Sequence, residues 1–181
     1  MRKRLRKKYS EQELKQVYAK PHEHHHWEDH RIRVEYTIEV AKQIKGVESV
    51  ADLSAGDATI INALNVSNKF IGDFAPKYEF EGLIEDTIDQ IPNVDLFICS
   101  ETLEHVDDPL YVLQKIRNKT NKLLLTTPEG KFNDTNPEHY WAWDNEGIRK
   151  LLIKAGFNPI RYDKLELAKQ YYYDYQIWVC E

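Results

Sequence analysis

The chain contains 181 residues, 41% of them hydrophobic, and carries a formal net charge of −5 at pH 7. This length suits one domain with an ample core, and two cysteines are too few for a disulfide framework. No apolar run approaches the roughly 20 residues of a membrane span, and no secretory signal is present, so we expect a cytoplasmic protein without a membrane partner.

The charge is unevenly distributed along the chain. Residues 2–8 hold six Lys and Arg, and setting these six positive charges aside from the net −5 leaves −11 on the rest. An acidic body argues against duplex DNA as a partner. The basic arm could contact phosphates or acidic lipids, but a frayed and solvated terminus is the commoner outcome for such a segment.

A short helix is predicted after the arm, because Ser10 and Glu13 form a capping box, and Pro21 would end it near Lys20. Three histidines at intervals of four follow, and they would share one face of a helix: His22, His26 and His30. They could hold a metal ion or face a substrate, but Pro21 and the lack of an apolar stripe favour a polar loop. We therefore divide the chain into a basic arm with a helical lid, residues 1–30, and a main domain, residues 31–181.

The main domain is predicted to begin with a helix over 31–45, followed by a strand, a tight turn and a second helix. The strand ends in Asp52, the turn contains Ser54 and Gly56, and the helix begins near Ile60. Small residues in such a turn let a nucleotide approach the backbone and the helix N-terminus. A second strand, 70–73, ends in Asp73, where an acid can accept hydrogen bonds from both hydroxyls of a ribose.

The segment between Asp73 and Val94 is too short for a full helix, strand and helix, so we expect a short or irregular third strand near 81–84. The fourth strand, 96–99, is followed by Ser100 and a polar stretch that contains Glu101, Glu104 and His105. So much polarity at the end of a buried strand predicts a site at the carboxyl edge of the sheet. A helix capped by Asp108 with Pro109 in its first position should follow.

The C-terminal third is predicted to contain a strand at 122–126, a helix capped by Asp144, and two strands at 157–167 and 173–180. The long loop between the first two elements is rich in turn residues and aromatics, and loops of this size are usually functional. We expect Trp143 to lie in the core and at least one of Tyr140, Trp141 and Trp143 to cover the substrate.

The turn after the first strand resembles motif I of the class I S-adenosylmethionine-dependent methyltransferases. Asp52 and Gly56 match that motif, whereas Ser54 and Ala58 stand where glycines are usual. The resemblance spans about residues 47–181 and implies an α/β fold with a doubly wound, mostly parallel sheet and an antiparallel last strand. It implies six cofactor contacts: Asp52, Ser54, Gly56, Asp73, Ser100 and, on the adenine side, Asp86.

Glu101-x-x-Glu104-His105, with the later His139, resembles the metal site of the small-RNA 3′-terminal 2′-O-methyltransferases. The Glu-x-x-Glu-His part is also similar to ubiquinone-pathway O-methyltransferases. The resemblance implies Glu101, Glu104, His105 and His139 as ligands of Mg²⁺, Mn²⁺ or Zn²⁺. Without a metal, Glu104, His105 and His139 would be the catalytic groups, with a histidine as general base.

The resemblance implies O-methylation of a small molecule or a terminal hydroxyl, with an RNA 3′ end as an alternative acceptor. No Asn/Asp-Pro-Pro-aromatic stretch or Pro-Cys nucleophile follows the fourth strand, which argues against a DNA amino-methyltransferase and against methylation of a pyrimidine carbon. Ser54 and Ala58 leave open a non-catalytic scaffold with a methyltransferase fold. A subunit that is active only inside a complex is a further alternative.

Overall fold

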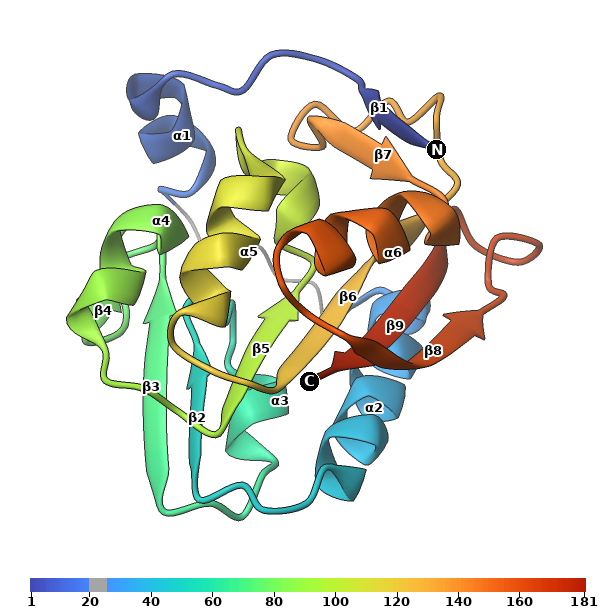
Figure 1. The fold of residues 1–181 in the computed structure, drawn as a ribbon. Coiled ribbons are helices and arrows are strands. Elements are labelled where there is room, and N and C mark those ends of the chain that lie inside the picture. The colour runs from blue at the N-terminus through green and yellow to red at the C-terminus, as the bar shows by residue number, and fades with distance from the viewer. Residues whose placement is uncertain (20–25) are drawn as a thin grey trace.

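The computed structural model describes residues 1–19 and 26–181 (Figure 1). His22 lies outside the described residues, so the predicted three-histidine face remains a prediction. The helices are α1 (Glu11–Val17), α2 (Glu28–Gln43), α3 (Thr59–Asn62), α4 (Ile84–Thr87), α5 (Pro109–Arg117) and α6 (Asn145–Lys154), with 3₁₀ turns η2 (Ile88–Gln90) and η3 (Leu103–His105). The strands are β1 (Arg2–Arg4), β2 (Ser49–Asp52), β3 (Asn68–Asp73), β4 (Phe80–Glu81), β5 (Leu96–Ser100), β6 (Leu123–Glu129), β7 (Trp141–Trp143), β8 (Pro159–Leu165) and β9 (Asp174–Cys180).

Seven strands form the main sheet in the order β4-β3-β2-β5-β6-β9-β8. The first five run parallel, whereas β9 is antiparallel to both β6 and β8. The chain moves outward from β2 to β3 and then returns to β5 on the other side of β2. This reversal places the carboxyl ends of β2 and β5 side by side, which is where ligands bind in open α/β sheets. The doubly wound, mostly parallel fold expected from the sequence is therefore confirmed.

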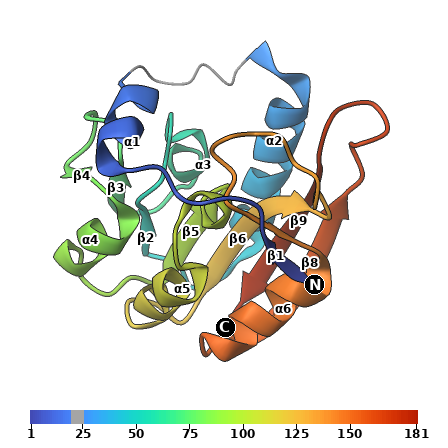
Figure 2. The ribbon, with the colours of Figure 1, turned by 90° about the horizontal axis from the view of Figure 1, so that it is seen from above.

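Helices cover both faces of the sheet (Figures 1 and 2). Along β5, Phe97 and Cys99 pack in the cluster formed with α4, α5 and α6, whereas Leu96 and Ile98 pack in the cluster formed with α2 and α3. All four side chains have 0% exposure. Side chains that alternate between two apolar layers need a strand that is apolar at every position, which explains the continuous run in the sequence.

Local capping signals define several helix starts as predicted. The Asp108 carboxylate accepts hydrogen bonds from the first turn of α5, and Pro109 occupies its first position. Asp144 caps α6 through the Gly147 N–H, and Ser10 forms the predicted capping box of α1. The third strand of the main sheet, β4, contains two residues, in agreement with the expected short strand.

The N-terminal arm departs from the expected frayed terminus. β1 pairs antiparallel with β7, so that Arg2 lies opposite Trp143 and Arg4 opposite Trp141. Both guanidinium groups stack on the Trp141 ring, at 3.9 and 4.8 Å from its centroid. Arg4 also forms an ion pair with Asp107. Backbone pairing and cation–π contacts thus fix a segment whose charge alone favours solvation.

The arm continues into α1, which lies above the carboxyl ends of the parallel strands (Figure 1). Just after α1, the Tyr18 ring meets the Phe74 ring edge-on, with 5.5 Å between centroids. Phe74 directly follows β3, so this contact joins the end of α1 to the sheet edge. Whether this segment acts as a lid over a bound ligand stays a prediction.

Candidate functional site

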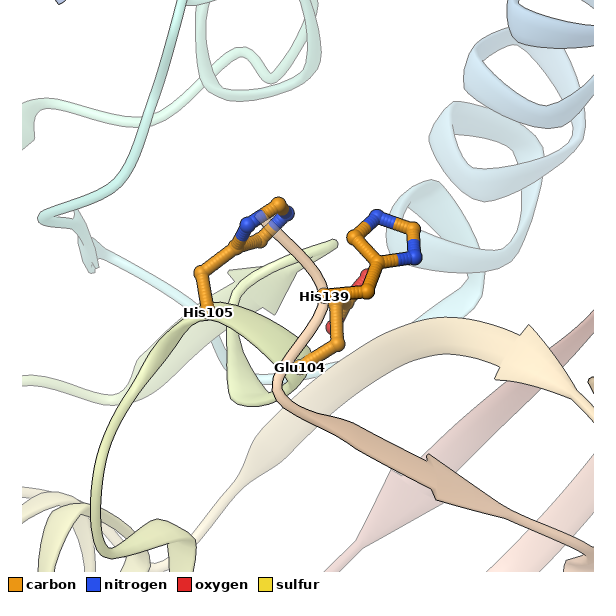
Figure 3. A group of neighbouring side chains, drawn as sticks. All are labelled: Glu104, His105 and His139. Atoms are coloured by element: carbon orange, nitrogen blue, oxygen red, sulfur yellow. The ribbon is translucent and has the colours of Figure 1, made fainter. Parts of the chain in front are cut away.

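The turn after β5 and the loop before β7 together build a cluster at the carboxyl edge of the sheet. η3 carries Glu104 and His105, and the loop brings His139 beside them (Figure 3). One ligand atom from each of these three side chains lies within 4.8 Å of the others. The Tyr140 N–H donates a 2.6 Å hydrogen bond to the Glu104 carbonyl, which ties the loop to η3. Residues 34 positions apart are thereby held in one site.

Glu104 is a buried carboxylate whose hydrogen bonding is incomplete. Its side chain is 1% exposed, Oε2 accepts a 3.0 Å hydrogen bond from Thr127 Oγ1, and Oε1 has no hydrogen-bond partner. Burial, helped by the negative charge of Glu101, raises the pKa of Glu104 to about 8. An unpaired oxygen on a buried carboxylate is costly unless a proton or a cation occupies the position beside it.

His139 is oriented by a second buried acid. Its Nδ1 lies 2.7 Å from Asp134 Oδ2, and the other oxygen of Asp134 accepts a 3.0 Å hydrogen bond from the Tyr173 hydroxyl. Burial alone would lower the pKa of His139, but the hydrogen bond to Asp134 and the charge of Glu104 hold it above its ordinary value. A carboxylate on Nδ1 is the usual partner of a metal-binding histidine, because it leaves Nε2 to the ligand.

Two of these groups, Asp134 and Tyr173, were missed in the sequence. Asp134 precedes His139 by five residues in a polar loop, which is a weak signal because such loops are generally rich in turn-forming acids. Tyr173 comes from a distant segment and carries no local signal. The His105 ring lies 4.8 Å from the His139 ring between centroids, and its Nδ1 is 3.0 Å from the Glu138 carbonyl oxygen.

Glu101 takes a different direction from the other predicted metal ligands. Its φ of 50° is in the left-handed region, which a glutamate rarely adopts. The side chain is directed toward β6, where Oε1 accepts a 2.8 Å hydrogen bond from Thr126 Oγ1. The structure therefore brings Glu104, His105 and His139 together and leaves Glu101 outside that group. Backbone strain of this kind is typical of functional sites.

Asp52 and Ser54 occupy the motif I turn after β2. Asp52 is 2% exposed, and its Oδ1 accepts a 3.1 Å hydrogen bond from the Ser54 N–H. Burial raises the pKa of Asp52, the hydrogen bonds from Ser54 offset only part of this rise, and the net value is about 7. The Ser54 hydroxyl lies 2.6 Å from Thr102 Oγ1, which connects the motif I turn to the turn after β5.

Asp73 stands at the end of β3 beside the same turn. Its Oδ2 accepts a 2.8 Å hydrogen bond from the Gly56 N–H, and Oδ1 accepts one of 3.0 Å from the Ala75 N–H. Gly56 has a φ of 57°, a conformation that favours glycine. A carboxylate oxygen can accept more than one hydrogen bond, so both oxygens retain capacity for a ribose diol. Asp73 ends the strand as expected, and its contact with a ribose stays a prediction.

Ser100 and Asp86 differ in how well their surroundings suit a cofactor contact. Ser100 Oγ accepts a 2.9 Å hydrogen bond from the buried Arg33 and lies 2.8 Å from Thr126 Oγ1. Asp86 is exposed on α4, whereas its neighbour Glu85 is half-buried and forms a 3.1 Å ion pair with Lys8. The adenine contact by Asp86 stays a prediction without a supporting contact.

The aromatic loop packs mainly against the arm and the core. Trp143 has 0% exposure, as predicted for a core residue, and Tyr140 has 1%. The Tyr140 ring meets that of Tyr9 edge-on, and Trp141 is covered by arginines of β1. The expected cover of the substrate by these rings finds no support in the contacts. Tyr173, whose ring lies 5.6 Å from the His139 ring, is the aromatic next to the cluster.

Sequence comparisons do not show a family for this chain. No protein-family model matches the chain. It is 26% identical over 113 residues to botulinum neurotoxin type D of Clostridium botulinum D phage, a match that covers 60% of this chain and 8% of the toxin. A match to so small a part of the toxin carries no argument about activity.

Solved structures give broader matches. The small-RNA methyltransferase HEN1 is 17% identical with a TM-score of 0.66, covering 83% of this chain and 25% of that chain. The putative methyltransferase of Haloferax volcanii, solved with the Trm112 activator, is 13% identical with a TM-score of 0.64. The match covers 81% of this chain and 86% of that chain. Magnesium protoporphyrin IX methyltransferase of Synechocystis, solved with S-adenosylhomocysteine, is 14% identical with a TM-score of 0.63. The match covers 83% of this chain and 82% of that chain.

These likenesses define the class. The chain has the class I methyltransferase fold, with the mixed seven-stranded sheet and the antiparallel β9. Among the helices of the described residues, none combines the length and the apolar character that a membrane crossing requires. The chain spans about a quarter of HEN1, so the activity of that whole protein is not transferred by the fold.

Proposed function

We propose that this chain is an S-adenosylmethionine-dependent methyltransferase that methylates a hydroxyl group, with a divalent cation held by Glu104, His105 and His139. The observation that carries the proposal is the buried Glu104 with its unpaired Oε1, next to two imidazoles at the ligand-binding edge of a methyltransferase fold. The solved neighbours act on small molecules and on RNA, as their names state. A small-molecule acceptor is our first choice.

The donor set supports a metal centre. One carboxylate and two imidazoles suit Mn²⁺ or Zn²⁺ better than Mg²⁺, which prefers oxygen ligands. A cation beside Glu104 Oε1 would satisfy a buried carboxylate oxygen that has no hydrogen-bond partner. The hydrogen bond between His139 and Asp134 supplies the outer contact that metal-binding histidines usually have.

Each group has a role that follows from its position. A bound divalent cation would lower the pKa of an acceptor hydroxyl and so make it a better nucleophile. Asp73 and the motif I turn would hold the ribose of the cofactor, and Asp52 keeps the turn in place through Ser54. Holding the acceptor oxygen in line with the sulfonium methyl would supply much of the remaining acceleration.

Calorimetry tests cofactor binding and metal binding separately. Binding of S-adenosylhomocysteine is expected for the wild type, and its absence would favour the scaffold with a methyltransferase fold. Titration with Mn²⁺ alone should show a site that is lost in Glu104→Ala and kept in Glu146→Ala, an exposed glutamate on α6 that serves as the matched control.

Activity supplies the second test. Excess EDTA should abolish methyl transfer and Mn²⁺ should restore it, whereas Glu104→Ala should not respond to added metal. Full activity in EDTA would reject the metal and leave His105 or His139 as the general base.

An RNA end is the second candidate acceptor, because the HEN1 likeness and the basic arm beside the His139 loop favour it. Residue Lys7 of that arm is exposed and available to phosphates. Methyl transfer to a short RNA with a 3′-terminal 2′-hydroxyl, and none to the same RNA ending in a 2′-deoxynucleotide, would establish this acceptor.

A further inference from the structure

Arg33 of α2 is a buried cation that forms no ion pair with any described carboxylate. The residue is 4% exposed, although arginine is rarely buried without a charged partner. Its Nη1 donates a 2.9 Å hydrogen bond to Ser100 Oγ, and its Nη2 lies 3.1 Å from His30 Nδ1. Both partners are neutral acceptors in these contacts. The positive charge therefore remains uncompensated in a place where desolvation makes that costly.

Neither the neighbouring Tyr175 ring nor Glu101 supplies the missing negative charge. Its Cζ lies 5.6 Å from the centroid of the Tyr175 ring, which is near the limit of a cation–π contact. Glu101, on the same edge, has Oε1 hydrogen-bonded to Thr126 and forms no ion pair with Arg33. The guanidinium has five N–H donors in a planar fork, and only two of its contacts use them.

The position of Arg33 adjoins the candidate cofactor contacts. Ser100, which accepts from Arg33, also contributes its carbonyl oxygen to a 3.1 Å hydrogen bond from Thr102 Oγ1. Thr102 in turn reaches Ser54 of the motif I turn over 2.6 Å. A continuous chain of polar contacts thus joins the buried cation to the turn that faces the ligand. The cation lies at the ligand-binding edge rather than at a structural ion pair.

We propose that Arg33, held by Ser100 and His30, binds an anionic oxygen group of a ligand at this edge. A planar guanidinium matches a carboxylate or phosphate through paired N–H donors. Such a group would come from the amino-acid end of the cofactor or from an anionic substituent of the acceptor. The first source rests on the proposed function, since it requires the cofactor to bind here.

Two ligands that differ in the amino-acid group separate these sources. S-adenosylhomocysteine carries the carboxylate, and 5′-methylthioadenosine lacks it. If the cofactor supplies the anion, Arg33→Gln should weaken binding of S-adenosylhomocysteine by about tenfold or more and leave that of 5′-methylthioadenosine unchanged. Arg31→Gln, which removes an exposed arginine from the same helix, is the matched control and should change neither.

If the acceptor supplies the anion, both nucleosides should bind the variant as they bind the wild type. Inorganic phosphate and pyrophosphate should then raise the melting temperature of the wild type and of Arg31→Gln, but not that of Arg33→Gln. Should Arg33→Gln fail to fold, Arg33→Lys can replace it, because lysine retains the charge without the planar fork. The affinities of this variant for S-adenosylhomocysteine and 5′-methylthioadenosine, and its response to phosphate, are then measured in the same way.

The proposal is overturned when a folded Arg33 variant binds both nucleosides and both phosphates as the wild type does. Failure of the proposed function looks different, because neither nucleoside would then bind the wild type. In that case the phosphate measurements decide the proposal on their own. A rise in melting temperature that is seen in the wild type and lost in the Arg33 variant would support it. A rise that is equal in both proteins, or absent from both, would reject it.

Discussion

Asp52→Asn should change how the free energy of unfolding depends on pH. The pKa of Asp52 is raised from 3.8 to about 7 by burial, so the folded chain binds this proton more tightly than the unfolded chain. Between those two values the folded state holds more protons, and its stability therefore falls as the pH rises. The gap of about three pH units corresponds to about 4 kcal/mol in total. Above pH 7 no further loss from this group is expected.

Part of this effect falls in a convenient pH range. Between pH 5.5 and 8.0 the group should cost the wild type about 2 kcal/mol, because only the portion of the transition above pH 5.5 is included. Asparagine has nearly the shape of the protonated acid and does not titrate. Urea unfolding at both pH values should give a pH dependence that is smaller by about 2 kcal/mol in Asp52→Asn. Equal pH dependence in the two proteins would show that Asp52 is ionised in the fold at pH 5.5, and the reasoning would be wrong.

Three further predictions address other parts of the molecule. Asp73→Ala should weaken binding of S-adenosylhomocysteine by about 10- to 100-fold in calorimetry, because charge-assisted hydrogen bonds to the ribose are lost; an unchanged affinity would remove Asp73 from the site. Gly147→Ala should lower the melting temperature and expose residues 2–8 to trypsin, because the added Cβ would lie 2.1 Å from the Met1 carbonyl oxygen; a higher melting temperature, as expected for alanine in an unhindered helix, would contradict this contact. Cys99 should not react with a thiol reagent in the native protein, because burial raises its pKa and excludes the reagent; rapid reaction would show that the strand opens.

Much of the fold and part of the site could be predicted, because they depend on local patterns and one topological rule. Residues that cap a helix or form a turn, such as Asp108, contact backbone groups only a few residues away, so their effect can be predicted from the local sequence. Asp52 and Asp73 end parallel strands and Glu104 follows one, and the carboxyl ends of parallel strands meet at one edge. His139 reached the same edge because its loop leaves the neighbouring strand.

The missed features depend on contacts or dihedral angles that the sequence does not display. Arg33 reads as a surface residue of a helix, and only the packing of α2 against the sheet buries it. Glu101 lies three residues before Glu104 and so was expected beside it, but a left-handed backbone turns its side chain toward β6. The pairing of Arg2 with Trp143 joins segments at opposite ends of the chain, and neither segment alone indicates a partner.

β9 enters the sheet between β6 and β8, although it is the last strand along the chain. While a ribosome adds the roughly 45 residues from Glu129 to Asp174, which takes about 2 to 9 s at ribosomal speeds, the apolar β6 lacks its neighbour on one side. β8, whose partner in the sheet is β9, is made late in this interval and also stays unpaired until β9 follows. An open apolar strand edge is a template for pairing with other nascent chains. Aggregation during synthesis, rather than weakness of the finished fold, is therefore the expected limit on soluble yield, and slower initiation or added chaperone should relieve it.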